Sequence, residues 1–118
     1  GADFTGANLT RAVIGYQTAI WGSYKPRSVM LGADFSNARL AGVDFHGAVL
    51  QFARFAAADL TGTMLAGSDL SRADFTNADL TNADLTDADL DGAILTGAKG
   101  LDTVKGLATA LHVDKAVR

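Results

Sequence analysis

The sequence predicts an all-β solenoid, because a five-residue period runs without interruption from residue 33 to residue 97. Every fifth residue in this stretch, from Phe35 to Leu95, is Leu or Phe, and the residue two places earlier is Ala in ten of the thirteen blocks. Neither a straight helix nor a flat strand keeps every fifth side chain on one face. If the chain turns a corner after each short extended segment, all of these side chains point inward and the coils stack about 4.8 Å apart.

The other positions of each block agree with this geometry. The outward position between the two inward residues is Asp in eight of the thirteen blocks, and the last two positions are rich in Thr, Ser, Asn, Asp and Gly, which favour turns. Four corners per coil would stack residues 20 apart and align Phe35, Phe55 and Phe75, whereas three corners would stack residues 15 apart and scatter them. The aligned Phe column favours four sides, with a three-sided coil as the alternative.

Two blocks, ADLTN at 78–82 and ADLTD at 83–87, resemble the tandem repeat A(D/N)LXX of the pentapeptide-repeat family. The resemblance implies a right-handed, four-sided parallel β-helix, which in this chain would have about five coils. It covers residues 33–97 continuously and is specific for the fold. It says little about function, because members of the family are mostly binding or scaffold proteins.

Three further blocks fill residues 2–16, with Phe4, Leu9 and Ile14 at their centres. They lie one residue out of phase with the later blocks. We expect the β-helix to span residues 1–100, as one domain.

The stretch 17–32 is read as a distorted continuation of the coil. Placing 23–27 on a face would point Lys25 into the core, where an unpaired charge is costly, so we expect a loop near 23–27. No cap precedes Gly1, so we expect the N-terminal end to have been cut or to meet another chain.

Beyond Gly97 the five-residue pattern decays. Apolar side chains then follow a helical spacing, with Asp102 or Thr103 available as N-cap. These side chains are Leu101, Val104, Leu107, Ala108 and Leu111. They predict a short C-terminal α-helix over 101–112 that caps the open end of the solenoid, followed by a tail over 113–118.

The charge of the chain is unevenly distributed. The net charge is −3 and all thirteen acids are Asp; residues 67–97 sum to −6, while 1–66 sum to +1 and 98–118 to +2. There is no Cys, which excludes disulfides, thiol catalysis and Cys–zinc sites. We also find no apolar run long enough to span a membrane and therefore expect no membrane contact.

The compartment stays open at this stage. No signal peptide is visible, and Gly1 falls inside a repeat, so the chain is read as a mature form or an excised fragment. The cytoplasm is the default, and the periplasm or thylakoid lumen would apply if a targeting segment had been removed.

No enzyme signature is found, and we expect neither a cofactor nor a metal. Residues 87–92 match the opening of a calcium loop, but Ala98 stands where a bidentate Glu is required. Residues 92–99 resemble a phosphate-binding loop only superficially. His46 and His112 have no second His or Cys at ligand spacing and are read as surface residues. The chain is therefore predicted to be non-enzymatic.

We predict a protein-interaction or structural scaffold module whose contacts lie where the repeat is interrupted. The stretch 16–31 holds the only Trp, the only Pro and both Tyr, and aromatic and Arg side chains are typical interface anchors. On a four-sided coil, Val29 and Val49 are adjacent outward residues, and Asp69 and Asp89 are their later equivalents. The candidate interaction residues are Tyr16, Trp21, Tyr24, Lys25, Arg27, Leu31, Val49 and Phe52.

Two readings of this patch remain open. The loop either folds back and buries the patch, or leaves it exposed to a partner. The expected partner is an unidentified protein, or a second copy bound through the N-terminal end or the 16–52 patch.

The acidic surface gives an alternative function. Some pentapeptide-repeat proteins imitate duplex DNA and engage type II topoisomerases, and this chain resembles them in its rod shape and Asp-rich surface. It departs from them in its few coils and its expected helical cap. The residues concerned are Asp69, Asp74, Asp79, Asp84, Asp87, Asp89 and Asp91. An ordinary solvated surface is the plainer reading, and direct nucleic-acid binding is disfavoured because phosphates would be repelled.

Overall fold

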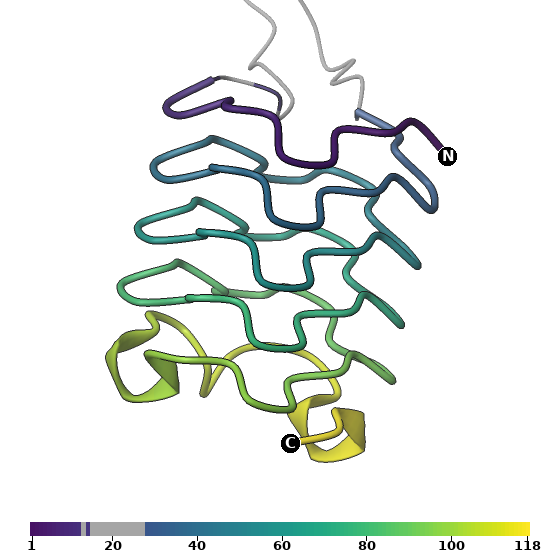
Figure 1. Ribbon diagram of the computed structural model, residues 1–118. Coiled ribbons are helices and arrows are strands. Elements are labelled where there is room, and N and C mark those ends of the chain that lie inside the picture. The colour runs from purple at the N-terminus through teal and green to yellow at the C-terminus, as the bar shows by residue number, and fades with distance from the viewer. Residues whose placement is uncertain (13, 15–27) are drawn as a thin grey trace, which may run out of the picture.

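The computed structural model describes residues 1–12, 14 and 28–118, and shows the chain wound into stacked coils (Figure 1). The coils are held by parallel bridges between single outward residues. In the middle of the chain the bridged residues lie 20 apart, as in the pairs Asp34–Arg54 and Val49–Asp69. Four five-residue blocks therefore make one coil, which confirms the four-sided prediction over the three-sided alternative.

Each column of bridged outward residues defines one face of the coil, which we name by its member within 48–67. The Val49 face carries Val29, Val49, Asp69, Asp89 and Leu111. The Arg54 face carries Asp3, Asp34, Arg54, Asp74, Ile94 and Val117. The Asp59 face carries Asn8, Arg39, Asp59, Asp79 and Lys99. The Met64 face carries Asp44, Met64, Asp84 and Lys105.

The inward residues form one continuous apolar core. From Phe35 to Leu95 every Leu and Phe at the centre of a block is at most 2% exposed. The predicted Phe column is present: the rings of Phe35, Phe55 and Phe75 stack with centroids 5.2 and 5.0 Å apart. Each buried Leu or Phe contributes roughly 1.5–3 kcal/mol, so the stack supplies most of the driving force for folding.

The corners follow from local side-chain chemistry. An outward Asp accepts a hydrogen bond from the backbone N–H two residues later, as from Thr81 to Asp79 at 3.0 Å, and the Thr81 hydroxyl donates to the same oxygen at 2.6 Å. The last residue of the block then takes a left-handed conformation, with φ of 59° at Asn82 and 64° at Gly62. Asp is favoured over Glu because only the shorter side chain reaches this amide.

The first coil has a longer register than the coils in the middle of the chain. Asp3 pairs with Asp34, 31 residues away, so this coil holds 11 residues more than the 20 found there. The Ser28 hydroxyl donates a hydrogen bond to the Ile14 carbonyl, so these two residues lie side by side. The loop expected near 23–27 lies outside the described residues.

Residues 101–112 do not form the predicted α-helix. The described part of the chain contains two short 3-10 helices, η1 (Leu101–Thr103) and η2 (Val113–Lys115), and no α-helix. Instead, the chain makes one more coil, whose outward residues are Lys99, Lys105, Leu111 and Val117. They lie six residues apart, so we call residues 98–117 the six-residue coil. The expected tail 113–118 belongs to it, since Val117 pairs with Ile94.

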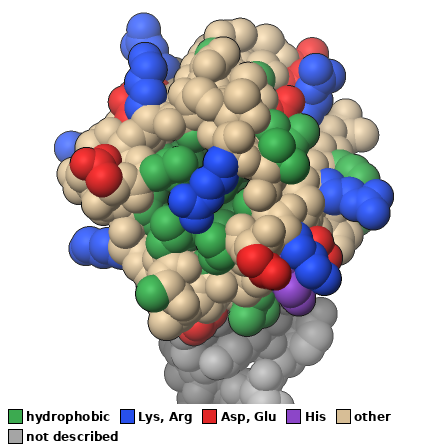
Figure 2. All heavy atoms as spheres, turned by 90° about the horizontal axis from the view of Figure 1, so that it is seen from below, with side chains coloured by type: hydrophobic (Ala, Val, Ile, Leu, Met, Phe, Trp, Pro, Cys, Tyr) green, Lys and Arg blue, Asp and Glu red, His purple; other side chains and the backbone are tan. Residues whose placement is uncertain are grey.

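The wrong helix prediction has a simple cause. The half-buried apolar residues of the six-residue coil lie three apart, a spacing that a helical stripe shares. They are Ala98, Leu101, Val104, Leu107, Ala110, Val113 and Ala116. Leu111, which the helical reading placed with them, points outward and is 51% exposed. Seen from the C-terminal end, hydrophobic side chains gather at the middle of this coil, where a basic side chain lies across them, and further Lys and Arg side chains surround its rim (Figure 2).

Candidate interaction surface

Three of the predicted interaction residues, Leu31, Val49 and Phe52, come together with Val29 beside one corner of the coil. The parallel bridge between Val29 and Val49 makes them neighbours on the Val49 face. Leu31 and Phe52 stand at the corner that follows, on neighbouring coils. Val29, Leu31 and Phe52 are 63%, 48% and 51% exposed, whereas Val49 is half-buried. We call these four residues the apolar patch.

Phe52 holds an unusual backbone conformation. Its φ of 61° lies in the left-handed region, where a residue with a Cβ costs roughly 1–2 kcal/mol and a bulky side chain is rare. The guanidinium carbon of Arg72, the equivalent corner residue of the next coil, lies 5.7 Å from the centre of the Phe52 ring. At an exposed site such a cation–π contact contributes about 0.5–1 kcal/mol, which offsets part of the strain.

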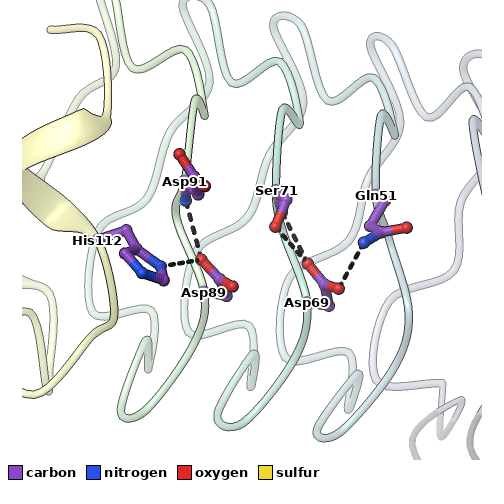
Figure 3. Close-up of polar contacts among 6 residues, drawn as sticks. All are labelled: Gln51, Asp69, Ser71, Asp89, Asp91 and His112. Atoms are coloured by element: carbon purple, nitrogen blue, oxygen red, sulfur yellow. Dashed lines mark hydrogen bonds and ion pairs between the residues drawn. The ribbon is translucent and has the colours of Figure 1, made fainter.

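The polar border of the patch is closely bonded. The Gln51 side-chain amide donates to Asp69 Oδ2 at 2.8 Å, while the Ser71 amide and hydroxyl donate to Asp69 Oδ1 at 3.1 and 2.6 Å (Figure 3). The Asp69 carboxylate is thereby held against its own face. The Val49 face therefore changes from apolar to acidic within one coil.

The remaining predicted contact residues cannot be placed on this surface. Tyr16, Trp21, Tyr24, Lys25 and Arg27 lie outside the described residues.

Three exposed apolar residues were missed by sequence reasoning. Met64, Leu111 and Val117 are 42%, 51% and 53% exposed and take outward positions on three different faces. The exposure of Met64 could have been predicted, because it fills the outward position of its five-residue block. Leu111 and Val117 could not be assigned outward positions without recognising that the period changes from five to six residues.

The acidic residues form a ring around one coil and not a stripe along the rod. Asp69, Asp74, Asp79 and Asp84 each occupy a different face, and we call them the acidic belt. Most of their neighbours in the same columns are uncharged or basic: Val49, Arg54, Met64, Ile94, Lys99 and Lys105. Asp89 lies on the next coil, and Asp87 and Asp91 stand at corners.

The belt carboxylates are engaged in the corners of their own coil. The pKa of Asp79 lies below its ordinary value because the Thr81 hydroxyl and amide donate to the charged form, and Lys99 adds a smaller attraction. Thr76 and Thr86 bond Asp74 and Asp84 in the same way. The belt aspartates thus have a structural role, because they accept the hydrogen bonds that close the corners of their own coil.

Other candidate chemistry receives no support. Among the described residues no group of three His, Cys, Asp or Glu is arranged to hold a metal, so the calcium-loop match at 87–92 has no counterpart in space. Both histidines contact aspartates: His46 lies against Asp44 at one corner, and His112 contacts Asp89 at 2.9 Å. No pocket is found in the described part of the chain. None of its helices has the length and apolarity needed to cross a bilayer.

The sequence profile described as Pentapeptide repeats matches residues 30–65 and 58–97, with eight copies of the repeat. The matched stretch is more than half of the chain. No curated protein matches the sequence closely enough to count as a relative.

Solved structures of similar proteins agree with this match. Rfr23, a pentapeptide repeat protein from the cyanobacterium Cyanothece 51142, is 30% identical, over 98% of this chain and 87% of that chain, with a TM-score of 0.50. QnrB1, a plasmid-mediated fluoroquinolone resistance protein, is 23% identical over 82% of this chain and 48% of that chain, with a TM-score of 0.57, and shows the fold alone. A pentapeptide repeat protein from the Arabidopsis thaliana thylakoid lumen is 26% identical over 89% of this chain and 59% of that chain, and its TM-score of 0.43 carries no argument about compartment.

Pentapeptide repeat proteins form right-handed quadrilateral β-helices. The 20-residue register, the buried Leu and Phe columns and the Asp-closed corners reproduce that architecture in this chain. Together with the profile match and the likeness to Rfr23, they show that the chain belongs to the pentapeptide-repeat family.

Proposed function

We propose that the protein is a non-catalytic interaction module that binds a protein partner through the apolar patch. The observation that carries the proposal is the Val29–Val49 bridge, which joins two outward valines beside exposed Leu31 and Phe52. Contiguous exposed apolar groups of this kind mark interaction sites on otherwise polar surfaces.

The position of the apolar patch supports a functional role for it, because its residues depart from the pattern of the repeat. The repeat places Asp at most outward positions, and the same column carries Asp69 and Asp89 further along. Phe52 occupies a left-handed corner whose equivalents on the neighbouring coils are Gly32 and Arg72, and the Arg72 contact offsets only part of the strain of an aromatic residue there. Strain kept without a folding benefit is typical of functional positions.

The proposed contact also includes the neighbouring segment. Tyr16, Trp21, Tyr24, Lys25 and Arg27 lie next to the patch in sequence and have the composition of interface anchors. Among the partners that this surface would suit is a second copy of the chain.

Affinity capture with matched variants tests the proposal. We expect Phe52→Ser and Trp21→Ala to lose partners that the wild-type protein retains, while Met64→Ser, an equally simple change on another face, retains them. Sedimentation of the purified proteins reports whether the partner is a second copy. Circular dichroism shows that each variant is folded. An unchanged set of partners for folded Phe52→Ser would overturn the assignment of the patch.

The acidic belt supports a second candidate, inhibition of a type II topoisomerase by imitation of DNA. Its four carboxylates surround the coil, but only Asp69 and Asp79 have an acidic neighbour in their columns, whereas duplex DNA carries charge about every 1.7 Å of its axis. The geometry therefore favours this candidate less than the apolar patch.

A supercoiling assay with DNA gyrase separates the two candidates. The leading proposal expects no inhibition. Inhibition that disappears in the triple variant with Asn at 79, 84 and 89 would favour topoisomerase inhibition over binding through the apolar patch. Asn is a suitable replacement because Asn8 already fills an outward position, with its Oδ1 accepting from the Thr10 amide at 3.2 Å and hydroxyl at 2.6 Å. The changes at Asp79 and Asp84 should thus keep their corners and lose only charge, whereas the change at Asp89 also removes the charge that faces His112.

A further inference from the structure

The six-residue coil is attached by fewer hydrogen bonds than the coils above it. In the five-residue coils, the N–H of each left-handed corner residue donates to a carbonyl of the next coil, as from Gly67 to Thr86 and from Arg72 to Asp91, both at 2.8 Å. At the transition, the amides of Asp87 and Gly92 have no such acceptor among the described residues. The longer corners place the carbonyls of the six-residue coil out of register with these amides.

At two corners of the transition, contacts that involve side chains connect the six-residue coil to the coil above. At one, the Asn82 amide donates to the Thr103 hydroxyl at 2.9 Å in place of a carbonyl. At the corner beneath Gly92, His112 Nδ1 lies 2.9 Å from Asp89 Oδ1, a contact between residues 23 apart in sequence. Figure 3 shows the His112 ring reaching from the last coil to the Asp89 carboxylate, which also accepts the Asp91 amide at 3.0 Å.

The surroundings of His112 favour its charged form. Asp89 and Asp91 face the ring from the coil above, and Lys115 faces it from its own turn. The hydrogen bond to Asp89 raises the pKa of His112 above its ordinary value of 6.5, against partial desolvation and Lys115. Partial burial of Asp89 works against its ionised form, but the hydrogen bonds from His112 and the Asp91 amide leave its pKa below 3.8.

We propose that residues 98–117 open and close as a unit, and that protonation of His112 holds this coil closed through Asp89. The pH dependence of this stabilisation follows from the directions of the two pKa shifts, raised for His112 and lowered for Asp89. A raised His112 pKa gives stability that is fully present below about pH 6.5 and is lost as the pH rises through the folded-state pKa. The Asp89 contribution is lost as the pH falls through its lowered pKa, below 3.8. The coil is therefore held most firmly between these limits and loosens as the pH rises through the raised pKa of His112.

Opening would change the surface of the molecule. Leu80, Leu85, Leu90 and Leu95 are at most 2% exposed beneath the coil, and its departure would uncover them. The protein would then present an apolar end and unpaired backbone groups more often when His112 is neutral.

Amide hydrogen exchange resolved by NMR tests the proposal. The probes are the amides of Leu85, Leu90 and Leu95, which donate to Lys105, Leu111 and Val117 across the transition. Their protection, corrected for intrinsic exchange, should fall roughly two- to five-fold between about pH 5.5 and about pH 8, the range expected for one exposed ion pair. The amides of Leu65 and Leu70, which donate within the five-residue coils, should not follow this change.

Two histidine variants give the decisive contrast. His112→Asn keeps a residue suited to the left-handed conformation at φ 57° and should abolish the pH step. His46→Asn removes the other His–Asp contact, which lies within a single corner, and should leave the step intact. Asp89→Asn should reduce the step while still accepting the Asp91 amide. A step that persists in His112→Asn, or protection at Leu90 equal to that at Leu70 at both pH values, would overturn the proposal.

Discussion

In residues 33–97 many corners are closed twice, once by an outward Asp that accepts an amide within its block and once by a bond between coils. In residues 98–117 the outward residues carry no carboxylate, and the corners close on themselves, as from the Thr103 amide to the Gly100 carbonyl at 2.9 Å. The first arrangement ties each corner to its neighbour above and below. The second stabilises the corner locally and leaves the attachment between coils to one bridge per face and a few side chains. One additional residue per side therefore gives a coil with more hydrogen bonds within its corners and fewer hydrogen bonds to the neighbouring coil.

The largest expected difference between the two regions concerns the core. Phe55→Ala removes a ring that stacks on both Phe35 and Phe75, and we expect it to lower the free energy of unfolding by about 3–5 kcal/mol. Leu107→Ala removes a half-buried side chain at the end of the stack and should cost about 1–2 kcal/mol. Urea denaturation followed by circular dichroism measures both. Equal losses would mean that the six-residue coil is as tightly packed as the interior.

Much of the fold could be predicted from the sequence because a single rule repeats. The 20-residue register follows from the Phe column, and it correctly placed Val29 beside Val49. The C-terminal prediction was wrong because inward residues three apart satisfy both a helix and a six-residue coil. The decisive clue was the recurrence of Lys-Gly-Leu at 99–101 and 105–107, a six-residue spacing that no helix requires.

The candidate site was less accessible to sequence reasoning. Its members follow from register, and that much was predicted. The stacking of Arg72 on the Phe52 ring depends on the left-handed corner and on side-chain rotamers, which no spacing rule contains. The contact between His112 and Asp89 depends on a change of period that was not recognised.

Glycine substitutions at one corner of each region sharpen the comparison. Gly62 and Gly106 are both left-handed, at φ 64° and 75°. A Cβ at Gly62 meets nothing within 4 Å, whereas one at Gly106 would lie 2.4 Å from the Thr86 Cα and 2.6 Å from its amide nitrogen. We expect Gly62→Ala to cost about 1 kcal/mol from backbone strain, and Gly106→Ala to cost about 2–4 kcal/mol because the coil must also move away.

Thermal unfolding of the two variants checks this prediction. Similar costs for both would show that the six-residue coil tolerates separation from the coil above. Hydrogen exchange at Leu85, whose amide donates to Lys105 at 2.8 Å, should increase in Gly106→Ala and stay unchanged in Gly62→Ala.

The smallest expected effect is present near neutral pH and disappears in acid. Thr81 and Thr109 each use their hydroxyl at a corner, but Thr81 donates to the Asp79 carboxylate at 2.6 Å, whereas Thr109 donates to the Gly106 carbonyl at 3.1 Å. The Thr81 hydroxyl is the first cause of the lowered Asp79 pKa, so its contribution is present above pH 3.8 and is lost as the pH falls through the lowered pKa. Thr81→Val should therefore destabilise the protein near neutral pH and progressively less below about pH 4, while Thr109→Val should have the same small effect at every pH. Urea midpoints measured from about pH 3 to about pH 7 decide the matter. Parallel profiles for the two variants would mean that the corner carboxylates of the five-residue coils act as neutral acceptors do, and that charge plays no part in the difference between the two kinds of corner.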